Sequence, residues 1–168
     1  MPDVLVGIAL GSNMGDRSAE LDAGISFLSD LAEGGEVRES PRIETAPVDC
    51  PPGSRPFLNS VAEIEVDTVS LPPLHLLSCL QEFEHARGRS PLRDVNAPRP
   101  LDLDIIYYGV ERFEHMGLII PHPRAHLRRF VLEPLSYLHP TFVLPGQTKT
   151  VKELLAEVME AERLAWKH

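Results

Sequence analysis

The chain of 168 residues is poor in cysteine and aromatic side chains and has no long apolar run. Its two cysteines, Cys50 and Cys79, cannot form a disulfide framework and lack the CxxC spacing of a zinc ribbon. No stretch approaches the roughly 18–20 apolar residues of a membrane span, and the N-terminus lacks the basic region of a signal peptide. We therefore expect a cytoplasmic monomer without a membrane partner, folded as a single domain over residues 1–168.

An overall positive charge is also missing. The net charge of −9 argues against a nucleic-acid partner, which normally meets a basic face. Residues 87–129, however, contain eight arginines and five acidic residues, whereas the remainder has eight basic and twenty acidic residues. All the bases of this segment are arginine, whose planar fork suits phosphate better than lysine does. The segment indicates either a site for a small polyanionic ligand or a solvated basic face.

Several familiar motifs are absent. The sequence has no GxxxxGK[ST] phosphate loop, no protein-kinase signature set and no HExxH zinc motif. The segment GSNMGD, residues 11–16, resembles a phosphate turn only loosely, and we assign its glycines to turn geometry.

Hydrophobic periodicity predicts an α+β protein. The first six predicted elements have the order β-α-β-β-α-β, which is typical of a ferredoxin-like split βαβ core, an antiparallel sheet with both helices on one face. Helices in the C-terminal part can cover the other face, and Thr150 and Glu153 have capping-box spacing. The predicted strands span 4–10, 36–44, 57–66 and 101–108, with 141–145 a candidate last strand; the predicted helices span 17–32, 71–85, 130–138 and 150–166.

Asp102 and Asp104 give the sharpest local signal for chemistry. Residues two apart in a strand share a face about 6.5–7 Å apart, so both carboxylates project together while Leu101, Leu103 and Ile105 point into the core. A small set of oxygen ligands suits Mg²⁺, which takes its other ligands from water and phosphate. Four arginines within the seventeen residues before Asp104 would complete a phosphoryl-transfer constellation. The alternative is a solvent-facing strand edge with two unrelated acids.

Polar and aromatic residues elsewhere suggest ligand contacts. His122, between two prolines, is the best histidine candidate for a phosphate contact. Phe57 and Phe130 adjoin polar segments and are either core residues or two faces that sandwich a flat heterocycle. Asn59 shares the strand face of Phe57, and its amide can pair with ring nitrogens and carbonyls.

Seven short motifs are similar to those of a known family. They are AlaLeuGlySerAsn (9–13), GluThrAlaPro (44–47), PheLeuAsnSerVal (57–61), GlyArg (88–89), AlaProArgProLeuAspLeuAspIle (97–105), ProHis (121–122) and ArgArgPheVal (128–131). In this order, over about residues 4–145, they resemble 6-hydroxymethyl-7,8-dihydropterin pyrophosphokinase, the folate-pathway enzyme. The ProArg-x-x-Asp-x-AspIle block is the most specific of them.

The resemblance implies transfer of pyrophosphate from ATP, as co-substrate, to the hydroxymethyl oxygen of the pterin, with release of AMP and with two Mg²⁺. By the same resemblance, Asp102 and Asp104 hold the metal, and Arg89 and Arg99 are catalytic. It assigns to ATP binding Leu77, Gln81, Glu84, Ile105, His122 and Arg128, and to pterin binding Thr45, Val48, Phe57, Asn59 and Phe130.

Three alternatives remain open at this point. They are another metal-dependent phosphotransferase or nucleotidyltransferase, a non-enzymatic ferredoxin-like domain that binds nucleotide or pterin, and a catalytically weak member of the family. The last is motivated by departures from the family pattern at Pro91, Val95, Asn96 and Pro123.

Overall fold

The secondary structure follows the predicted order in most segments. The computed structural model describes residues 3–46, 52–88 and 100–166. The first half contains β1 (Asp3–Ser12), α1 (Arg17–Leu31), β2 (Arg38–Glu39), β3 (Ile43–Thr45), β4 (Phe57–Asp67) and α2 (Pro73–Ala86). The second half contains β5 (Asp102–Tyr108), β6 (Phe113–His115), β7 (Leu118–Ile120), a 3-10 turn (Ala125–Leu127), α3 (Arg129–Leu138) and α4 (Val151–Trp166).

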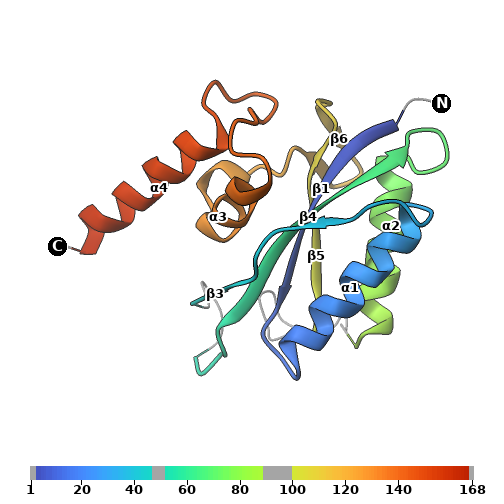
Figure 1. Ribbon diagram of the computed structural model, residues 1–168, viewed down its shortest axis with the longest axis horizontal. Coiled ribbons are helices and arrows are strands. Elements are labelled where there is room, and N and C mark those ends of the chain that lie inside the picture. Colours follow the sequence, from blue (N-terminus) through green and yellow to red (C-terminus); the bar gives the residue numbers. More distant parts are fainter. Residues whose placement is uncertain (1–2, 47–51, 89–99, 167–168) are drawn as a thin grey trace.

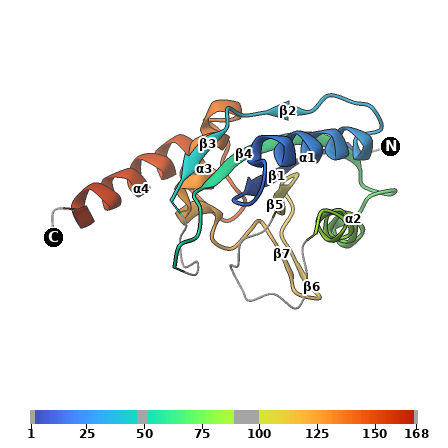
Figure 2. The same cartoon turned by 90° about the horizontal axis from the view of Figure 1, so that it is seen from below.

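The main sheet has the strand order β2-β4-β1-β5, with β3 pairing alongside β2 on β4, and every pairing is antiparallel. This is the order expected for the split βαβ core, so the predicted fold class is confirmed. Both helices of the core, α1 and α2, pack on one face against the buried side chains of Val6, Ile8 and Leu10 from β1. The other face carries a second core, in which α3 and α4 pack on Val61, Ile106 and Tyr107. Figures 1 and 2 show the strands between these two pairs of helices.

The prediction of one continuous strand over 36–44 is wrong, because the segment forms two short strands, β2 and β3. Ser40 and Pro41 cause the division. The Ser40 N–H donates to the Val61 carbonyl at 2.9 Å, but the Ser40 hydroxyl accepts the Val61 N–H at 3.0 Å. A side chain thus takes the place of a backbone acceptor, and Pro41 has no N–H with which to continue the ladder.

The C-terminal segments differ from the prediction in two places. Residues 113–120 form the β6–β7 hairpin, which the sequence pattern did not indicate. Residues 141–145 are not a strand, because the carbonyls of Pro140 and Phe142 accept the first amides of α4, from Lys152 and Val151, at 3.0 and 2.8 Å. The predicted capping box of α4 is confirmed by reciprocal hydrogen bonds between Thr150 and Glu153.

A bulge in β5 changes which face its side chains reach. Ile8 pairs with Ile105 and Gly7 with Tyr107, so Ile106 is an extra residue on β5. As a result Ile105 belongs to the first core, whereas Ile106 and Tyr107 both belong to the second. The Ile106 carbonyl accepts the backbone N–H of His122 at 2.8 Å, and this bond places His122 beside β5.

A row of four residues crosses the sheet at Gly7. Arg38, Glu63, Gly7 and Tyr107 stand opposite one another on β2, β4, β1 and β5. The Tyr107 ring lies over Gly7, where any Cβ would collide with it, and its hydroxyl donates to the fully buried Glu63 carboxylate. Arg38 and His139 contact the same carboxylate at 3.4 and 3.1 Å. None of the helices in the described residues combines the length and the apolar composition of a membrane span.

Candidate functional site

A second row across the same face, at Gly11, brings the predicted site residues together. Gly11 of β1 pairs with Asn59 of β4 on one side and with Asp102 of β5 on the other. In the adjacent row, Ala9 pairs in the same way with Val61 and Asp104. The amide and both carboxylates therefore project from one sheet face, near the end of the sheet where β1 ends and β4 and β5 begin. These strand ends are the lower ones in Figure 1. The predicted common face of Asp102 and Asp104 is confirmed, with Leu101, Leu103 and Ile105 buried on the opposite face.

Gly11 forms the floor between these side chains. It lies inside β1, and its φ is not in the left-handed region, so the assignment of this glycine to a turn is wrong. The turn is made by Gly15, whose φ is 67°. A Cβ on Gly11 would lie 2.9 Å from Asn59 Oδ1 and 3.5 Å from the Phe57 ring. Glycine inside a strand signals close approach by another group, and this sequence signal could have found Gly11.

Asn59 is held in a fixed orientation. It is 6% exposed, and its Nδ2 donates to the Thr45 hydroxyl at 2.6 Å. This bond turns the amide oxygen toward Gly11, where it can accept an N–H from a ligand. Phe57, two residues earlier, is half-buried on the same face, so the pair suits a flat heterocycle with N–H donors. Another predicted pterin contact, Val48, lies outside the described residues.

The donor set on β5 fits Mg²⁺. Asp102 and Asp104 are half-buried and offer only oxygen atoms. Among the described residues, no group of three or more His, Cys, Asp or Glu side chains is arranged to hold a metal ion. Two carboxylates are what Mg²⁺ takes from proteins when water and phosphate oxygens supply the other ligands.

His122 is a neutral hydrogen-bond donor beside this face. Burial, followed by the positive charges of Arg128 and Arg124, lowers the pKa of His122 to about 4, and Asp102 opposes that shift. Its Nδ1 accepts the backbone N–H of Arg124 at 3.1 Å, so the ring proton resides on Nε2. A neutral N–H close to two arginines can donate a hydrogen bond to an anionic oxygen, such as that of a phosphate.

Phe130 and Arg128 are in contact with each other. The Arg128 guanidinium lies 5.3 Å from the centre of the Phe130 ring, in a cation–π arrangement. Phe130 is half-buried at the start of α3 and packs against the second core. Its predicted role as a stacking face, opposite Phe57, stays a prediction.

The remaining predicted ATP contacts lie on the α2 side of β5. Leu77 and Ile105 pack in the first core, and Gln81 is exposed on α2. Glu84 is buried, and its Oε2 accepts the backbone N–H of Leu103 at 2.7 Å. A nucleotide that reached these residues and the carboxylates would have to pass round the edge of β5. Arg89 and Arg99, the predicted catalytic arginines, lie outside the described residues.

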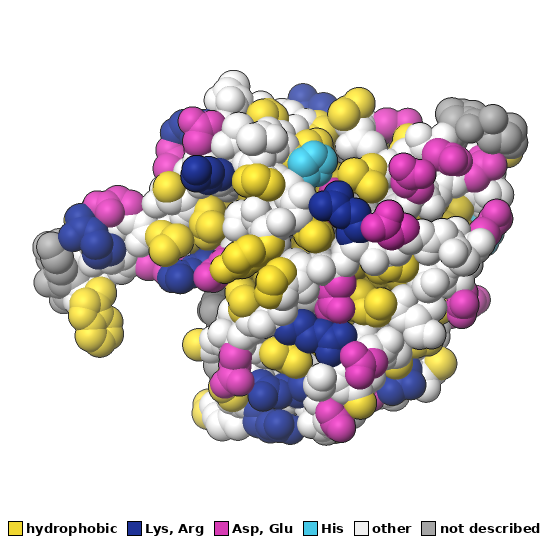
Figure 3. Space-filling model, in the orientation of Figure 1, with side chains coloured by type: hydrophobic (Ala, Val, Ile, Leu, Met, Phe, Trp, Pro, Cys, Tyr) yellow, Lys and Arg dark blue, Asp and Glu magenta, His cyan; other side chains and the backbone are white. Residues whose placement is uncertain are grey.

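The arginine-rich segment is partly structural. Arg87 forms two hydrogen bonds with Glu20, at 2.9 and 3.0 Å, and Arg129 pairs with Glu133 and Glu162 at 3.0 and 2.6 Å. Arg124 and Arg128, by contrast, lie close enough to His122 to lower its pKa. Figure 3 shows basic and acidic side chains interspersed over the face that it presents, so no continuous basic surface is seen there.

Comparison with known proteins gives the family. The family model for 7,8-dihydro-6-hydroxymethylpterin-pyrophosphokinase (HPPK) matches residues 7–140. A Bacillus subtilis 2-amino-4-hydroxy-6-hydroxymethyldihydropteridine pyrophosphokinase is 41% identical over 130 residues, 77% of this chain and 74% of that protein. The Haemophilus influenzae enzyme of the same name is 37% identical over 150 residues, 89% of this chain and 90% of that protein.

Solved structures agree on the fold. A crystal structure of an HPPK-DHPS in complex with substrates superposes with a TM-score of 0.77 at 11% identity. The match covers 100% of this chain and 45% of that one, so the chain spans less than half of the solved protein. Fold and family model together define an α+β pyrophosphokinase. The chain belongs to the 7,8-dihydro-6-hydroxymethylpterin-pyrophosphokinase family, whose enzymes use ATP and act in folate biosynthesis.

Proposed function

We propose that this chain transfers pyrophosphate from ATP to the hydroxymethyl oxygen of 6-hydroxymethyl-7,8-dihydropterin, giving the pterin diphosphate and AMP. The observation that carries the proposal is the row Asn59–Gly11–Asp102. It separates an amide suited to a heterocycle from a metal-binding carboxylate by two strand spacings, or about 10 Å. A two-ring heterocycle lying over Gly11 would extend its substituent toward the carboxylates.

The chain's own residues would act by binding and orientation. Asn59 Oδ1 would accept an N–H of the pterin and fix the ring on the Gly11 floor. The Nε2–H of His122 and the guanidinium of Arg128 would donate to phosphate oxygens, with Arg89 and Arg99 stabilising the transferring group. The pterin oxygen then bonds to the β-phosphorus, the bond to the α-phosphate oxygen breaks, and the hydroxyl proton leaves to water.

Asp102 and Asp104 would hold the two Mg²⁺ ions. When bound, Mg²⁺ supplies neutralisation of phosphate charge and a lower pKa for the attacking hydroxyl. The two carboxylates share one strand face and an oxygen-only donor set, and these features support the assignment.

The test is a magnesium-dependent assay of the chain with ATP and 6-hydroxymethyl-7,8-dihydropterin, in which AMP, ADP and the pterin product are separated by chromatography. We expect AMP and pterin diphosphate in equal amounts. Release of ADP would overturn the proposal in favour of a simple phosphotransferase. Binding of both ligands without any product would identify a non-enzymatic domain.

We further propose that the chain works as a cytoplasmic monomer and a single domain, with these small molecules as its partners rather than nucleic acid or membrane. The net charge of −9 supports the exclusion of nucleic acid. Light scattering during size-exclusion chromatography tests the monomer, since a mass of twice 18.7 kDa would contradict it.

A further inference from the structure

Glu84 is a buried carboxylate that lies on the α2 side of β5, away from the face of Asp102 and Asp104, and the proposed reaction does not use it there. It belongs to the last turn of α2 and is 5% exposed. Its Oε2 accepts the Leu103 backbone N–H at 2.7 Å. Leu103 is the residue between Asp102 and Asp104, and its side chain points into the first core, away from the two carboxylates.

The position of β5 explains why this amide needs such a partner. In the order β2-β4-β1-β5, β5 is an edge strand with β1 on one side. Amides of an antiparallel strand point alternately to its two sides. The Leu103 N–H points to the outer side, where no strand of the described chain pairs with it, and Glu84 takes the place of a strand there.

Glu84 lies near the C-terminal end of α2, where the helix dipole disfavours a negative group. What a carboxylate provides is a charge-assisted hydrogen bond, which is shorter and stronger than a neutral one. The 2.7 Å distance to Leu103 lies in that short range.

We propose that Glu84 is a positioning residue for the metal-binding strand. By holding the backbone between Asp102 and Asp104, it fixes the two side chains so that they address the same cations. This role rests on the proposed function and differs from the direct ATP contact that the family resemblance implies for Glu84. Outer partners that orient metal ligands typically contribute about 10–100-fold to metal affinity.

Three substitutions and a control test this role. Glu84→Gln keeps an acceptor oxygen at the same reach, Glu84→Asp keeps the charge but is one methylene too short, and Glu84→Ala removes both. Glu82→Ala is the matched control, because Glu82 is an exposed carboxylate on the same helix. Each protein is measured for exchange of the Leu103 amide by NMR without metal, for Mn²⁺ affinity by paramagnetic resonance, and for kcat and the KM for ATP.

We expect Glu84→Ala and Glu84→Asp to speed exchange of the Leu103 amide and to lower Mn²⁺ affinity and kcat by about 10–100-fold. Glu84→Gln should lose less than Glu84→Asp, about threefold, since it keeps the hydrogen bond but loses the charge that strengthens it, and Glu82→Ala should match the wild type. The KM for ATP should change little in any of them.

Several results would overturn the role. Wild-type Mn²⁺ affinity in Glu84→Asp, despite an exposed Leu103 amide, would show that this hydrogen bond does not position the carboxylates. Equal losses of Mn²⁺ affinity and kcat in Glu84→Gln and Glu84→Asp would show that the effect comes from the charge and the packing of the side chain together, and not from the hydrogen bond to Leu103. A rise confined to the KM for ATP would make Glu84 a nucleotide contact. If the wild type released no AMP, the proposed function would fail, whereas the exchange and Mn²⁺ results would still decide the role of Glu84.

Discussion

At the scale of single residues, Gly11 determines the shape of the site most directly. Its neighbours Asn59 and Asp102 face each other across it, and the space above it exists only because glycine has no side chain. A methyl group there would meet Asn59 Oδ1 at 2.9 Å, and Asn59 cannot turn away without breaking its 2.6 Å bond to Thr45. Space for the heterocycle and orientation of the amide are therefore coupled.

We expect Gly11→Ala to raise the KM and the Kd for the pterin at least about tenfold, a loss of about 1.4 kcal/mol, while the Kd for ATP stays within about threefold. Calorimetric titration with each ligand measures this difference. Gly117→Ala is the control, because Gly117 has a φ of 83° in the β6–β7 hairpin and a methyl group added there would meet no atom within 4 Å. It should cost stability and leave pterin affinity unchanged. Wild-type pterin binding by Gly11→Ala would contradict the proposed floor.

His122 makes stability depend on pH with a predictable sign. Its pKa falls from an ordinary 6.5 to about 4 in the folded chain, mainly through burial. Between these values the unfolded chain binds a proton that the folded chain does not, so the free energy of unfolding falls as the pH falls. After allowance for solvent screening of this half-buried ring, the contribution is about 1–2 kcal/mol.

Urea unfolding of the wild type and of His122→Asn at pH 7.5 and 4.5 measures this contribution. Carboxylates titrate in both proteins, whereas only the wild type has the His122 imidazole. When the pH is lowered from 7.5 to 4.5, the free energy of unfolding should fall less in His122→Asn than in the wild type, and the difference should be about 1–2 kcal/mol. Equal losses in the two proteins would show that His122 titrates normally in the folded state.

At the scale of elements, the sequence predicts the helices and strands that depend on residues close to one another in the chain. The predicted helix over 17–32 is observed as Arg17–Leu31, and the predicted strand over 57–66 as Phe57–Asp67, because each has a regular apolar face. The common face of Asp102 and Asp104 followed from strand geometry alone. The bulge at Ile106 and the break at Ser40 could not be predicted in this way, since both depend on partners far along the chain, His122 and Val61.

The same limit applies to the row at Gly7. Its members come from four strands, and only the register of the folded sheet brings Tyr107 across Gly7 to the buried Glu63. Burial, with the hydrogen bond to Glu63 as a second cause, raises the pKa of Tyr107, so the phenol remains a donor to the carboxylate. This bond joins β5 to β4 across the intervening β1.

We expect Tyr107→Phe to lower the free energy of unfolding by about 1–3 kcal/mol, because it removes a donor from a buried charge. The Gly11 row lies four residues further along β1, so kcat should be unchanged. Chemical denaturation gives the stability, and the double-mutant cycle with Glu63→Leu gives the coupling, because Tyr107→Phe should cost less when no carboxylate is present. An equal cost in both backgrounds would rule out the hydrogen bond as the cause.

At the scale of the whole molecule, the two faces of the sheet have different tasks. The face under α1 and α2 is filled by the first core over its length. On the other face, α3 and α4 cover the part around Val61 and Tyr107, and the Gly11 row lies beyond them. The site thus draws residues from β1, β3, β4, β5 and the segment before α3, which is why no single stretch of sequence could reveal it.

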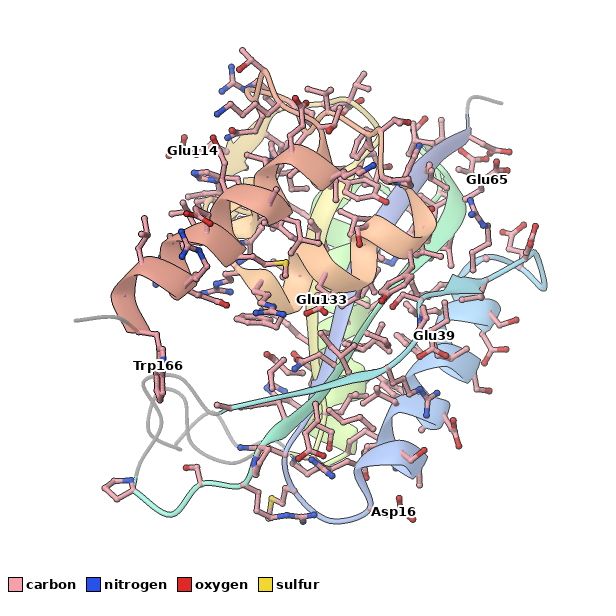
Figure 4. All side chains as sticks on the ribbon, turned by 60° about the vertical axis from the view of Figure 1, so that its left-hand side comes forward. Asp16, Glu39, Glu65, Glu114, Glu133 and Trp166 are labelled. Atoms are coloured by element: carbon pink, nitrogen blue, oxygen red, sulfur yellow. The ribbon has the colours of Figure 1, made fainter. Side chains whose placement is uncertain are left out.

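The outer end of α4 extends beyond both cores. Its buried residues, Val151 and Leu154, belong to the first turn, and contact with the second core continues only as far as Val158. The last turn ends at Trp166, which is 90% exposed and lies at the tip of α4 in Figure 4. Figure 1 shows the same end of the helix standing clear of the sheet. Stability should therefore come from the inner half of α4.

Removal of residues 163–168 should change the free energy of unfolding by less than about 1 kcal/mol, since the described positions that it cuts, 163–166, are exposed and hold one surface ion pair, Arg163–Glu160. It keeps the Arg129–Glu162 pair, which joins α4 to α3. Leu154→Ala, in contrast, should cost about 2–5 kcal/mol, because it leaves a cavity under the first turn. Urea denaturation of the two variants compares these values directly. A truncated chain as unstable as Leu154→Ala would mean that the outer turns pack on the protein after all, and the division of α4 into an anchoring and a projecting half would have to be abandoned.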